Sequence, residues 1–385
     1  MHVLHLLEAT SGGTRRHLRD LALGLLQNKI KLTIVASTLR DPDFIKDIRL
    51  FKQSGIDVVT LKIRRNLAPI SDFYAICRLI HICRILKPDV LHAHSSKAGM
   101  IGRLAAFIAG VPVVYTPHAF AWEGHEHGLL RFLFRLAEKF LTPLTSALIA
   151  VSDHERQLAR ELRIPDERIY QIYNGVDVTI SNKALTLKKK ELGKDRNLTV
   201  GFAGRLCRQK GPDIFLKSIP LILKNIPGCK FIMVASAGNM AEKLRRFVAR
   251  QPWRESLSWY TANNELETMA AMGKIDILTM PSRWEGLPYT LLEAMQAKVP
   301  VIASNVGGIP EVIEHDLTGI LLKKNSYEEL ARAVGSLADG REKSKQIKEA
   351  AFKRVVDFSL TNMVEETFLV YQAVCREKSD REIST

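Results

Sequence analysis

The sequence alternates short apolar segments with amphipathic segments of helical length, and this alternation runs through the chain twice. The first series occupies residues 1–175 and the second occupies residues 198–359. The stretch between them, 176–197, is polar and includes three consecutive lysines. Strands that alternate with helices of this length are typical of a parallel, doubly wound sheet. The chain therefore predicts an α/β fold of two Rossmann-like domains, joined by a linker and facing a central crevice.

The expected strands lie at regular intervals in both halves. In the first half they are Val3–Leu7, Lys31–Ala36, Val58–Leu61, Val90–Ala93, Val113–Thr116, Ala147–Val151 and Ile169–Tyr173. In the second half they are Leu198–Ala203, Lys230–Ala235, Ile275–Met280, Val299–Ala303 and Gly319–Leu322. A last amphipathic helix is expected at about 360–376. The length of 385 residues exceeds what one ordinary core requires, which supports two domains.

The net charge of +15 indicates an anionic partner, for which nucleic acid, anionic lipid and phosphorylated substrates all qualify. The five cysteines are scattered and form no C-x-x-C pair, which fits free thiols in a reducing cytoplasm. No apolar run approaches the roughly 18 residues that span a bilayer. The N-terminal segment lacks the basic start and the cleavage site of a signal peptide. We therefore expect a soluble cytoplasmic protein.

Two basic segments in the first half bear on the choice of partner. Residues 62–87 carry six cations against one acid, Asp72. Residues 129–140 have the pattern of a basic amphipathic helix, which is able to lie on a membrane surface. The same pattern also fits a core helix whose basic residues face water. The sequence leaves both interpretations open.

The stretch 282–295 is the most informative local pattern. It follows the expected strand Ile275–Met280, and a helix is expected to begin near Pro288. The carboxyl end of a strand and the N-terminus of a helix together favour an anion, because free N–H groups and the helix dipole point there. Glu285 and Glu293 flank this site, and carboxylates accept hydrogen bonds from sugar diols. The combination suggests a sugar nucleotide.

Two further loops carry residues suited to phosphate. Arg205 and Lys210 follow the strand Leu198–Ala203, and a guanidinium with an ammonium suits a diphosphate. Gly12 and Gly13 follow the first strand, where glycine lets the backbone approach a ligand closely. Taken alone, a Gly-Gly pair is more often a tight turn, and a basic loop is often only solvated.

These pieces occur along nearly the whole chain, together with His92–Gly99, Tyr115–Phe120 and a glycine loop at Gly307 and Gly308. In this order they resemble the retaining glycosyltransferases of the GT-B fold, family four, of the bacterial polysaccharide and lipid-linked oligosaccharide type. The resemblance implies that the first domain binds the acceptor and the second binds the donor. It also implies that the last helix crosses back to the first domain.

The resemblance implies a role for each matching residue. Glu285 would hold hydroxyls of the donor sugar and Glu293 those of the ribose. Arg205 and Lys210 would stabilise the departing diphosphate in place of a metal ion, and His118 would contact the donor near its reacting carbon. The expected catalytic residues are Glu285, His118, Arg205 and Lys210. The expected donor site comprises Gly12, Gly13, Arg205, Lys210, Ser282, Glu285, Gly286, Leu287, Pro288, Glu293, Gly307 and Gly308, with no metal and no cofactor.

Other patterns are less specific. Lys97 is expected near the acceptor, and Asp41–Asp43 is expected to be a turn, although it spells the D-x-D metal motif of another glycosyltransferase fold. Residues 123–127 hold metal-like residue types without the spacing of a zinc motif, and we place them at the acceptor mouth. This cluster consists of Glu123, His125, Glu126 and His127. Residues 236–240 depart from the glycine-rich turn that is frequent in the family, so recognition of the base is expected to differ in detail.

The sequence thus predicts an enzyme that moves a sugar from a nucleotide-sugar, with UDP the expected nucleotide, to a glycan acceptor linked to a polyprenyl diphosphate. An exopolysaccharide or O-antigen pathway fits, with peripheral contact to an anionic membrane at its cytoplasmic face. A UDP-sugar 2-epimerase shares the fold and is an alternative that needs no acceptor. A nucleic-acid-binding protein would explain the net charge, but no nucleic-acid motif occurs, and we expect no nucleic-acid partner.

Overall fold

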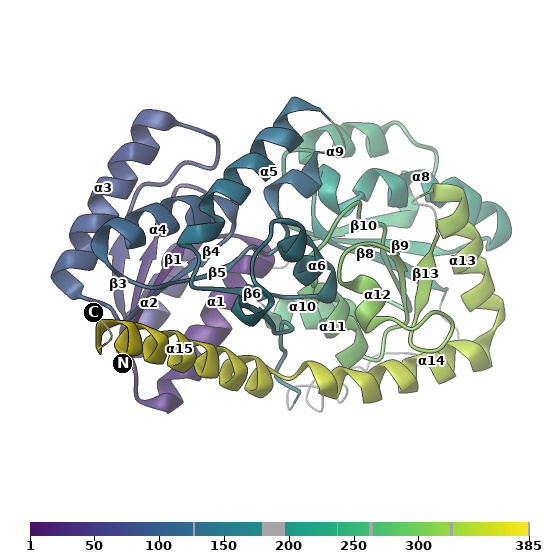
Figure 1. The fold of residues 1–385 in the computed structure, drawn as a ribbon. Helices are drawn as coiled ribbons and strands as arrows, with labels where there is room; N and C mark the ends of the chain where they lie inside the picture. The colour runs from purple at the N-terminus through teal and green to yellow at the C-terminus, as the bar shows by residue number, and fades with distance from the viewer. Residues whose placement is uncertain (126–127, 179–196, 237, 262–264, 324–325, 384–385) are drawn as a thin grey trace. The chain divides into compact units, whose positions relative to one another are not determined.

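The chain forms two compact units in the computed structural model (Figure 1). Unit 1 comprises Met1–Gly175 and Leu360–Thr385, and unit 2 comprises Val176–Ser359. The structure describes residues 1–125, 128–178, 197–236, 238–261, 265–323 and 326–383. Most of the expected linker, 176–197, lies outside these ranges. Its first residue, Val176, forms an isolated bridge with Ser359.

The sheet of unit 1 has seven parallel strands in the order β3-β2-β1-β4-β5-β6-β7. They are β1 (His2–Leu7), β2 (Lys31–Ala36), β3 (Asp57–Thr60), β4 (Val90–His94), β5 (Val113–Thr116), β6 (Ala147–Ala150) and β7 (Ile169–Gln171). The order reverses between β1 and β4, and ligands of such sheets bind beside this point at the carboxyl ends of the strands. All seven strands that the sequence predicts for this half are present, with ends that differ by no more than two residues.

Helices cover both faces of this sheet (Figure 1). They are α1 (Gly12–Leu25), α2 (Phe44–Gln53), α3 (Pro69–Leu86), α4 (Ser96–Ala109), α5 (Leu129–Leu141), α6 (Asp153–Glu161) and α15 (Leu360–Ile383). Val3 and Leu7 of β1 pack with α1, α2 and α15, whereas Leu4 and Leu6 pack with α3 and α4. Because side chains alternate between the two faces of a strand, both sets must be apolar, which explains the apolar run of β1.

The sheet of unit 2 has six parallel strands in the order β10-β9-β8-β11-β12-β13. They are β8 (Thr199–Arg205), β9 (Lys230–Ser236), β10 (Leu257–Tyr260), β11 (Ile277–Met280), β12 (Val301–Ser304) and β13 (Ile320–Leu322). The helices are α8 (Pro212–Asn225), α9 (Ala241–Ala249), α10 (Glu265–Met272), α11 (Tyr289–Gln296), α12 (Ile309–Val312), α13 (Tyr327–Asp339) and α14 (Arg341–Arg354). Here the order reverses between β8 and β11, so their carboxyl ends mark the expected ligand position.

Some details differ from the sequence expectation. The edge strand β10 is not predicted, because in its four residues only Leu257 is buried and no apolar alternation stands out. Helix α8 runs through Pro220 without a break, and Pro220 itself is exposed. Helix α15 extends to Ile383, beyond the expected end. No helix of the described residues has the length and the apolar character that crossing a membrane requires.

The last helix, α15, belongs to the core of unit 1. Met363, Tyr371 and Val374 are buried in the same apolar cluster as α1 and β1. The hydroxyl of Tyr371 lies 2.6 Å from Nδ1 of His92 in β4. The C-terminal segment therefore completes a core whose other members come from the first 175 residues.

Replacing Tyr371 by alanine should lower the free energy of unfolding by about 3–5 kcal/mol, since a fully buried ring is removed and a cavity remains. Leu369→Ala is the matched control, because Leu369 lies in the same helix and is 60% exposed. This control should change the free energy by no more than about 0.5 kcal/mol. Urea unfolding of the two variants measures the difference, and equal effects would contradict the placement of α15.

Candidate active site

Glu285 lies at the centre of the site in unit 2. It belongs to the loop between β11 and α11, and only 3% of its surface is exposed. Its Oε1 lies 2.6 Å from Nζ of Lys210 and accepts a hydrogen bond of 2.6 Å from Oγ of Ser282. Its other oxygen, Oε2, makes no hydrogen bond to any described residue. A buried carboxylate is therefore held by one oxygen while the second stays available to accept hydrogen bonds from a ligand.

The loop after β8 is fastened to the loop after β11. The guanidinium of Arg283 donates to both carboxylate oxygens of Asp213, at 2.7 and 3.0 Å. The backbone N–H of Arg283 donates to the carbonyl of Gln209 at 2.7 Å, and the Gln209 amide donates to the carbonyl of Trp284 at 3.2 Å. Arg205 donates to Oε1 of Gln209 at 3.0 Å. The two loops thus form one structure that fixes Lys210 against Glu285.

Two glycines permit this close packing. At Gly307 the backbone has φ +55°, and an added Cβ would lie 1.8 Å from the carbonyl oxygen of Glu285. At Gly211 φ is +67°, and a Cβ would lie 2.0 Å from the carbonyl oxygen of Pro281. The N–H of Gly308 also donates to the carbonyl of Gly286 at 2.8 Å. The loops after β8, β11 and β12 therefore meet around Glu285 at distances that no side chain allows.

Helix α11 begins directly after this loop. Pro288 is its N-cap residue with extended backbone, so the helix starts one residue later, at Tyr289. Leu287 is buried at this entry, and Glu293 lies in the second turn with 5% of its surface exposed. The helix N-terminus and the two expected carboxylates are thus parts of one short segment, as the sequence predicts.

The structure therefore brings together most of the expected donor-site residues of unit 2. Lys210, Ser282, Glu285, Gly286, Gly307 and Gly308 are in direct contact in the ways given above. Arg205 is connected to them through Gln209, and Leu287, Pro288 and Glu293 follow in the same segment. The other expected residues, Gly12, Gly13 and His118, lie in unit 1.

In unit 1 the expected residues lie at the carboxyl ends of β1 and β5. Gly12 and Gly13 are exposed and open helix α1, and Gly12 has φ +65°. His118 follows β5 with φ +54°, and Ala119 beside it has φ +72°. Two consecutive residues other than glycine in this conformation are strained, and such strain is frequent at functional sites. Glu155 of α6 holds the strained turn by accepting a hydrogen bond from the N–H of Ala119.

A chain of hydrogen-bonded histidine rings runs inward from His118. Its Nε2 lies 3.4 Å from Nδ1 of His94, whose Nε2 lies 3.1 Å from Nδ1 of His5. Next to them, His17 bonds through Nδ1 to Oδ1 of Asn174 at 2.9 Å. The nitrogens of His92 bond to Tyr371 and to Thr116. The sequence analysis named His118 as a site residue and His92 and His94 only as parts of a family segment. It missed His5 and His17, because they lie far from the other members in the chain.

Burial sets the protonation of these groups. Desolvation lowers the pKa of His5 to about 3 and that of His17 to about 4, and it lowers those of His92 and His94 well below 6.5. The rings are therefore neutral at physiological pH. Desolvation also raises the pKa of the Glu155 carboxyl to about 7. The network around His118 thus carries little charge, in contrast to the ion pairs of unit 2.

Two groups of three histidines have ligand atoms within 4.8 Å of one another: His5, His92 and His94, and His17, His94 and His118. Neutral imidazoles at such distances are candidate metal ligands. In the first group, however, five of the six ring nitrogens already have a hydrogen-bonding partner, and only Nε2 of His5 is left without one among the described residues. We therefore interpret the cluster as a hydrogen-bonded network.

Residues of the less specific sequence patterns form hydrogen bonds or ion pairs within unit 1. Asp41 and Asp43 form the expected turn, in which the N–H of Asp43 donates to Oδ1 of Asp41 at 3.0 Å. Lys97 is ion-paired with Asp72 of α3. In the cluster expected at the acceptor mouth, Glu123 bonds to Nε2 of His154 at 2.8 Å. Two further members of this cluster, Glu126 and His127, lie outside the described residues. Ala237 lies outside them too; it belongs to residues 236–240, which differ from the glycine-rich turn of the family.

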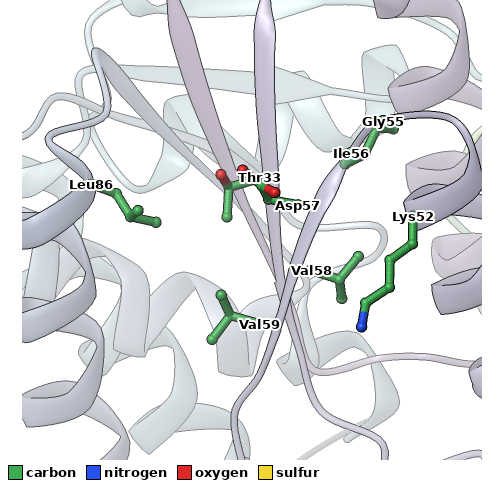
Figure 2. A pocket seen from close by; sticks show the side chains of 8 residues that line it. All are labelled: Thr33, Lys52, Gly55, Ile56, Asp57, Val58, Val59 and Leu86. Atoms are coloured by element: carbon green, nitrogen blue, oxygen red, sulfur yellow. The ribbon is translucent and has the colours of Figure 1, made fainter.

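A separate hollow lies along the outer strand β3, and Figure 2 shows its lining. Gly55, Asp57 and Leu86 place it near the amino ends of the strands, away from the histidine network. Its charged side chains are Lys52 and Asp57, and it contains none of the expected site residues. We therefore do not assign the donor or acceptor to it.

Family models match both halves of the chain. Residues 11–180 match the model described as Glycosyltransferase Family 4, and residues 185–354 match the model described as Glycosyl transferases group 1. Together they span most of unit 1 and unit 2. The chain belongs to the family-four glycosyltransferases. The expectation of this family from the sequence is therefore confirmed, and the protein is an enzyme that transfers sugars.

Similar proteins support the assignment. The UDP-Gal:alpha-D-GlcNAc-diphosphoundecaprenol alpha-1,3-galactosyltransferase of Escherichia coli is 29% identical over 310 residues, which cover 78% of this chain and 80% of that protein. The capsular polysaccharide biosynthesis glycosyltransferase CapM of Staphylococcus aureus is 23% identical, covering 87% and 90%. The solved structure of Anabaena HepE in complex with UDP and glucose matches with a TM-score of 0.81 at 20% identity, covering 97% and 100%. The fold of this glycosyltransferase is GT-B, as predicted.

Gly307→Ala should lower the free energy of unfolding by about 1–3 kcal/mol, since the backbone conformation and the Glu285 carbonyl both exclude a Cβ. Gly335→Ala is the matched control. Gly335 lies inside α13, and a Cβ added there would have no atom within 4 Å, so alanine should stabilise the helix by about 0.4–1 kcal/mol. Thermal unfolding of both variants tests the contact, and a Gly307→Ala protein as stable as the wild type would refute it.

Lowering the pH from about 7.5 to about 5.5 should destabilise unit 1. Unfolded histidine binds a proton below about pH 6.5, but His5 and His17, with pKa values of about 3 and 4, stay neutral when folded. Each of these two histidines therefore lowers the free energy of unfolding by about 1.4 kcal/mol per pH unit below pH 6.5. Glu155 has the opposite sign, because the folded form gains its proton below about pH 7 and the unfolded form only below 4.5, so it offsets one histidine.

Proteolysis in urea, with fragments of unit 1 identified by mass spectrometry, measures this pH dependence. His5→Gln should reduce it, because one buried ring that resists protonation is removed. His81→Gln is the control, since His81 is exposed on α3 and should leave the dependence unchanged. A urea midpoint of unit 1 that is the same at both pH values would contradict the prediction.

Proposed function

We propose that this glycosyltransferase moves a sugar from a UDP-sugar to a glycan acceptor linked to a polyprenyl diphosphate, with retention of the anomeric configuration. The observation that carries the proposal is the buried Glu285 with one oxygen bound by Lys210 and Ser282 and the other open. A carboxylate fixed in this way beside a helix N-terminus is suited to sugar hydroxyls next to a phosphate.

The donor is proposed from the chemistry of unit 2. Lys210 and Arg205 supply positive charge at the carboxyl end of β8, and the N-terminus of α11 supplies the positive end of a helix dipole. These groups would stabilise the negative charge that develops on a departing diphosphate, so that no metal ion is required. The presence of UDP in the Anabaena HepE structure supports UDP as the nucleotide.

The roles of individual residues follow the same chemistry. Glu285 would bind hydroxyls of the transferred sugar through Oε2, and Glu293 would bind the ribose. Gly12 and Gly13, with exposed backbone at the start of α1, would meet the diphosphate. His118 would contact the donor near the reacting carbon as a neutral hydrogen-bonding group, since burial lowers its pKa. The acceptor hydroxyl would attack from the side of the leaving group, and the leaving phosphate would take its proton.

The acceptor is proposed from the relatives. The name of the Escherichia coli relative specifies an undecaprenyl diphosphate carrier, and that of the Staphylococcus aureus relative specifies capsular polysaccharide biosynthesis. An exopolysaccharide or O-antigen type of pathway fits both. An acceptor with a polyprenyl tail resides in a membrane, so we place the reaction at the cytoplasmic face of the inner membrane, with the protein in peripheral contact.

Incubation of the purified protein with UDP-sugars and GDP-sugars, without acceptor, tests the donor site. One donor should raise the melting temperature and be hydrolysed slowly. Glu285→Gln and Lys210→Met should each reduce this hydrolysis by about 100-fold or more, since each removes a group that orients or stabilises the reacting donor. Lys217→Met is the matched control, because Lys217 is exposed on α8 and should leave hydrolysis unchanged.

Product analysis separates the remaining alternative. A UDP-sugar that is released with an inverted carbon 2 would identify a 2-epimerase instead of a transferase. Binding to nucleic acid, without a response to any sugar nucleotide or to free UDP and GDP, would overturn the proposed function altogether.

A further inference from the structure

Helix α5 turns its apolar side outward. Leu129, Phe132 and Phe140 are 71%, 60% and 73% exposed, although these are the residues that a core helix would bury. Its one acid, Glu138, points inward and is 5% exposed. The structure therefore contradicts the interpretation of this segment as a core helix whose basic residues face water.

A buried polar network fixes this orientation. Glu138 accepts hydrogen bonds from Nη2 of Arg103 at 2.6 Å and from the hydroxyl of Tyr115 at 2.9 Å. Arg103 is 1% exposed, donates to the carbonyl of Gly99 and lies over the ring of Tyr115. If α5 rolled its apolar side inward, Arg103 would be left buried without its carboxylate, which is strongly unfavourable. The buried network of Glu138, Arg103 and Tyr115 thus keeps the apolar side of α5 facing outward.

Helix α3 repeats the arrangement. In its first two turns Ile70, Phe73 and Tyr74 are 89%, 69% and 59% exposed. Its one acid, Asp72, is buried, accepts a hydrogen bond from the N–H of Ala68 at 3.1 Å and pairs with Lys97 of α4. Here too a buried carboxylate sets which side of the helix faces outward.

The two apolar surfaces belong to one layer of unit 1. Helix α4 contacts both α3 and α5, and all three cover the same face of the sheet (Figure 1). Both α3 and α5 begin after a strand of the sheet, so their first turns lie toward the carboxyl edge, where His118 also lies. We call the exposed apolar residues of these turns the apolar rim. It consists of Ile70, Phe73, Tyr74, Leu129, Leu130, Phe132 and Leu133.

Within the two segments that carry the apolar rim the exposed charges have one sign, although Arg135 is paired with the exposed Glu161 of α6. In residues 62–87 the six cations are exposed and the only acid is the buried Asp72. In residues 129–141 the cations are Arg131, Arg135 and Lys139, and the only acid is the buried Glu138. An apolar surface bordered by cations, without an exposed acid in either segment, complements a bilayer that contains anionic lipid.

We propose that the first turns of α3 and α5 form a membrane-docking surface, in which the apolar rim enters an anionic bilayer and the basic residues around it contact the lipid headgroups. The reason for such a surface rests on the proposed lipid-linked acceptor, whose diphosphate lies at headgroup depth. Docking through this rim brings the carboxyl edge of the unit 1 sheet to the same depth.

Flotation of the full chain with vesicles, in the absence of donor and acceptor, tests the docking directly. The protein should bind vesicles of phosphatidylethanolamine with phosphatidylglycerol, and it should bind phosphatidylcholine vesicles far less. Phe132→Ser and Ile70→Ser should each reduce the partition coefficient by about tenfold, since each removes an apolar side chain that enters the bilayer. The double variant Arg64→Glu/Arg65→Glu should abolish the preference for anionic lipid.

Leu369→Ser is the matched control. Leu369 is as exposed as Phe132 but lies on α15, at the opposite face of the sheet, so its replacement should leave vesicle binding unchanged. Hydrolysis of the donor in the absence of vesicles should be the same in Phe132→Ser and in the wild type, which separates loss of docking from loss of the enzyme.

Three results would overturn the proposal. The first is a wild-type protein that does not float with anionic vesicles. The second is a loss of binding in Leu369→Ser that equals the loss in Phe132→Ser. The third is a dimer in analytical ultracentrifugation that Phe132→Ser dissociates, because the apolar rim would then be covered by a second copy of the chain.

Discussion

The ion pair between Lys210 and Glu285 determines the geometry of the site in unit 2. Both side chains are largely buried, at 16% and 5% exposure, so either charge without the other would be strongly unfavourable. The pair joins loops that follow neighbouring strands, and the Arg283–Asp213 pair joins the same loops a second time. Such a carboxylate is held in place before a ligand binds, which reduces the ordering that binding requires. The close approach of the Gly307 loop follows from the same packing.

Buried polar groups are stabilised in different ways around Glu285 in unit 2 and around His118 in unit 1. Near Glu285, opposite charges are paired at the carboxyl ends of the strands. Near His118, burial keeps the histidines neutral, so His118, His94 and His5 are connected without net charge. A neutral ring at His118 can donate and accept hydrogen bonds, but it brings no positive charge. Under the proposed function, compensation of the diphosphate charge is the role of Arg205 and Lys210.

Much of the fold could be predicted because it depends on local patterns. Buried parallel strands are nearly continuous apolar runs, and twelve of these were recognisable. The segment 282–295 was also readable, since a strand end, a helix start and two carboxylates lie within a few residues. Contacts between distant residues were not readable. Lys210 and Glu285 are 75 residues apart and His5 and His94 are 89 apart, and no periodicity relates such pairs. The pairing of an expected phosphate ligand with an expected sugar ligand was therefore not foreseen.

Helix α5 shows most clearly what the periodicity of a sequence does not predict. Its pattern defines an apolar side and a basic side, but the direction in which each side faces depends on the free energies of burial. Burying the apolar side would gain the hydrophobic term for several large residues. The observed orientation forgoes that gain and instead buries Glu138 with Arg103 and Tyr115. An arrangement that leaves large apolar residues in water is stable in the isolated protein only because the buried pair resists disruption. The forgone hydrophobic free energy is recovered when another apolar phase covers the exposed side of α5. The membrane in which the proposed acceptor resides supplies such a phase.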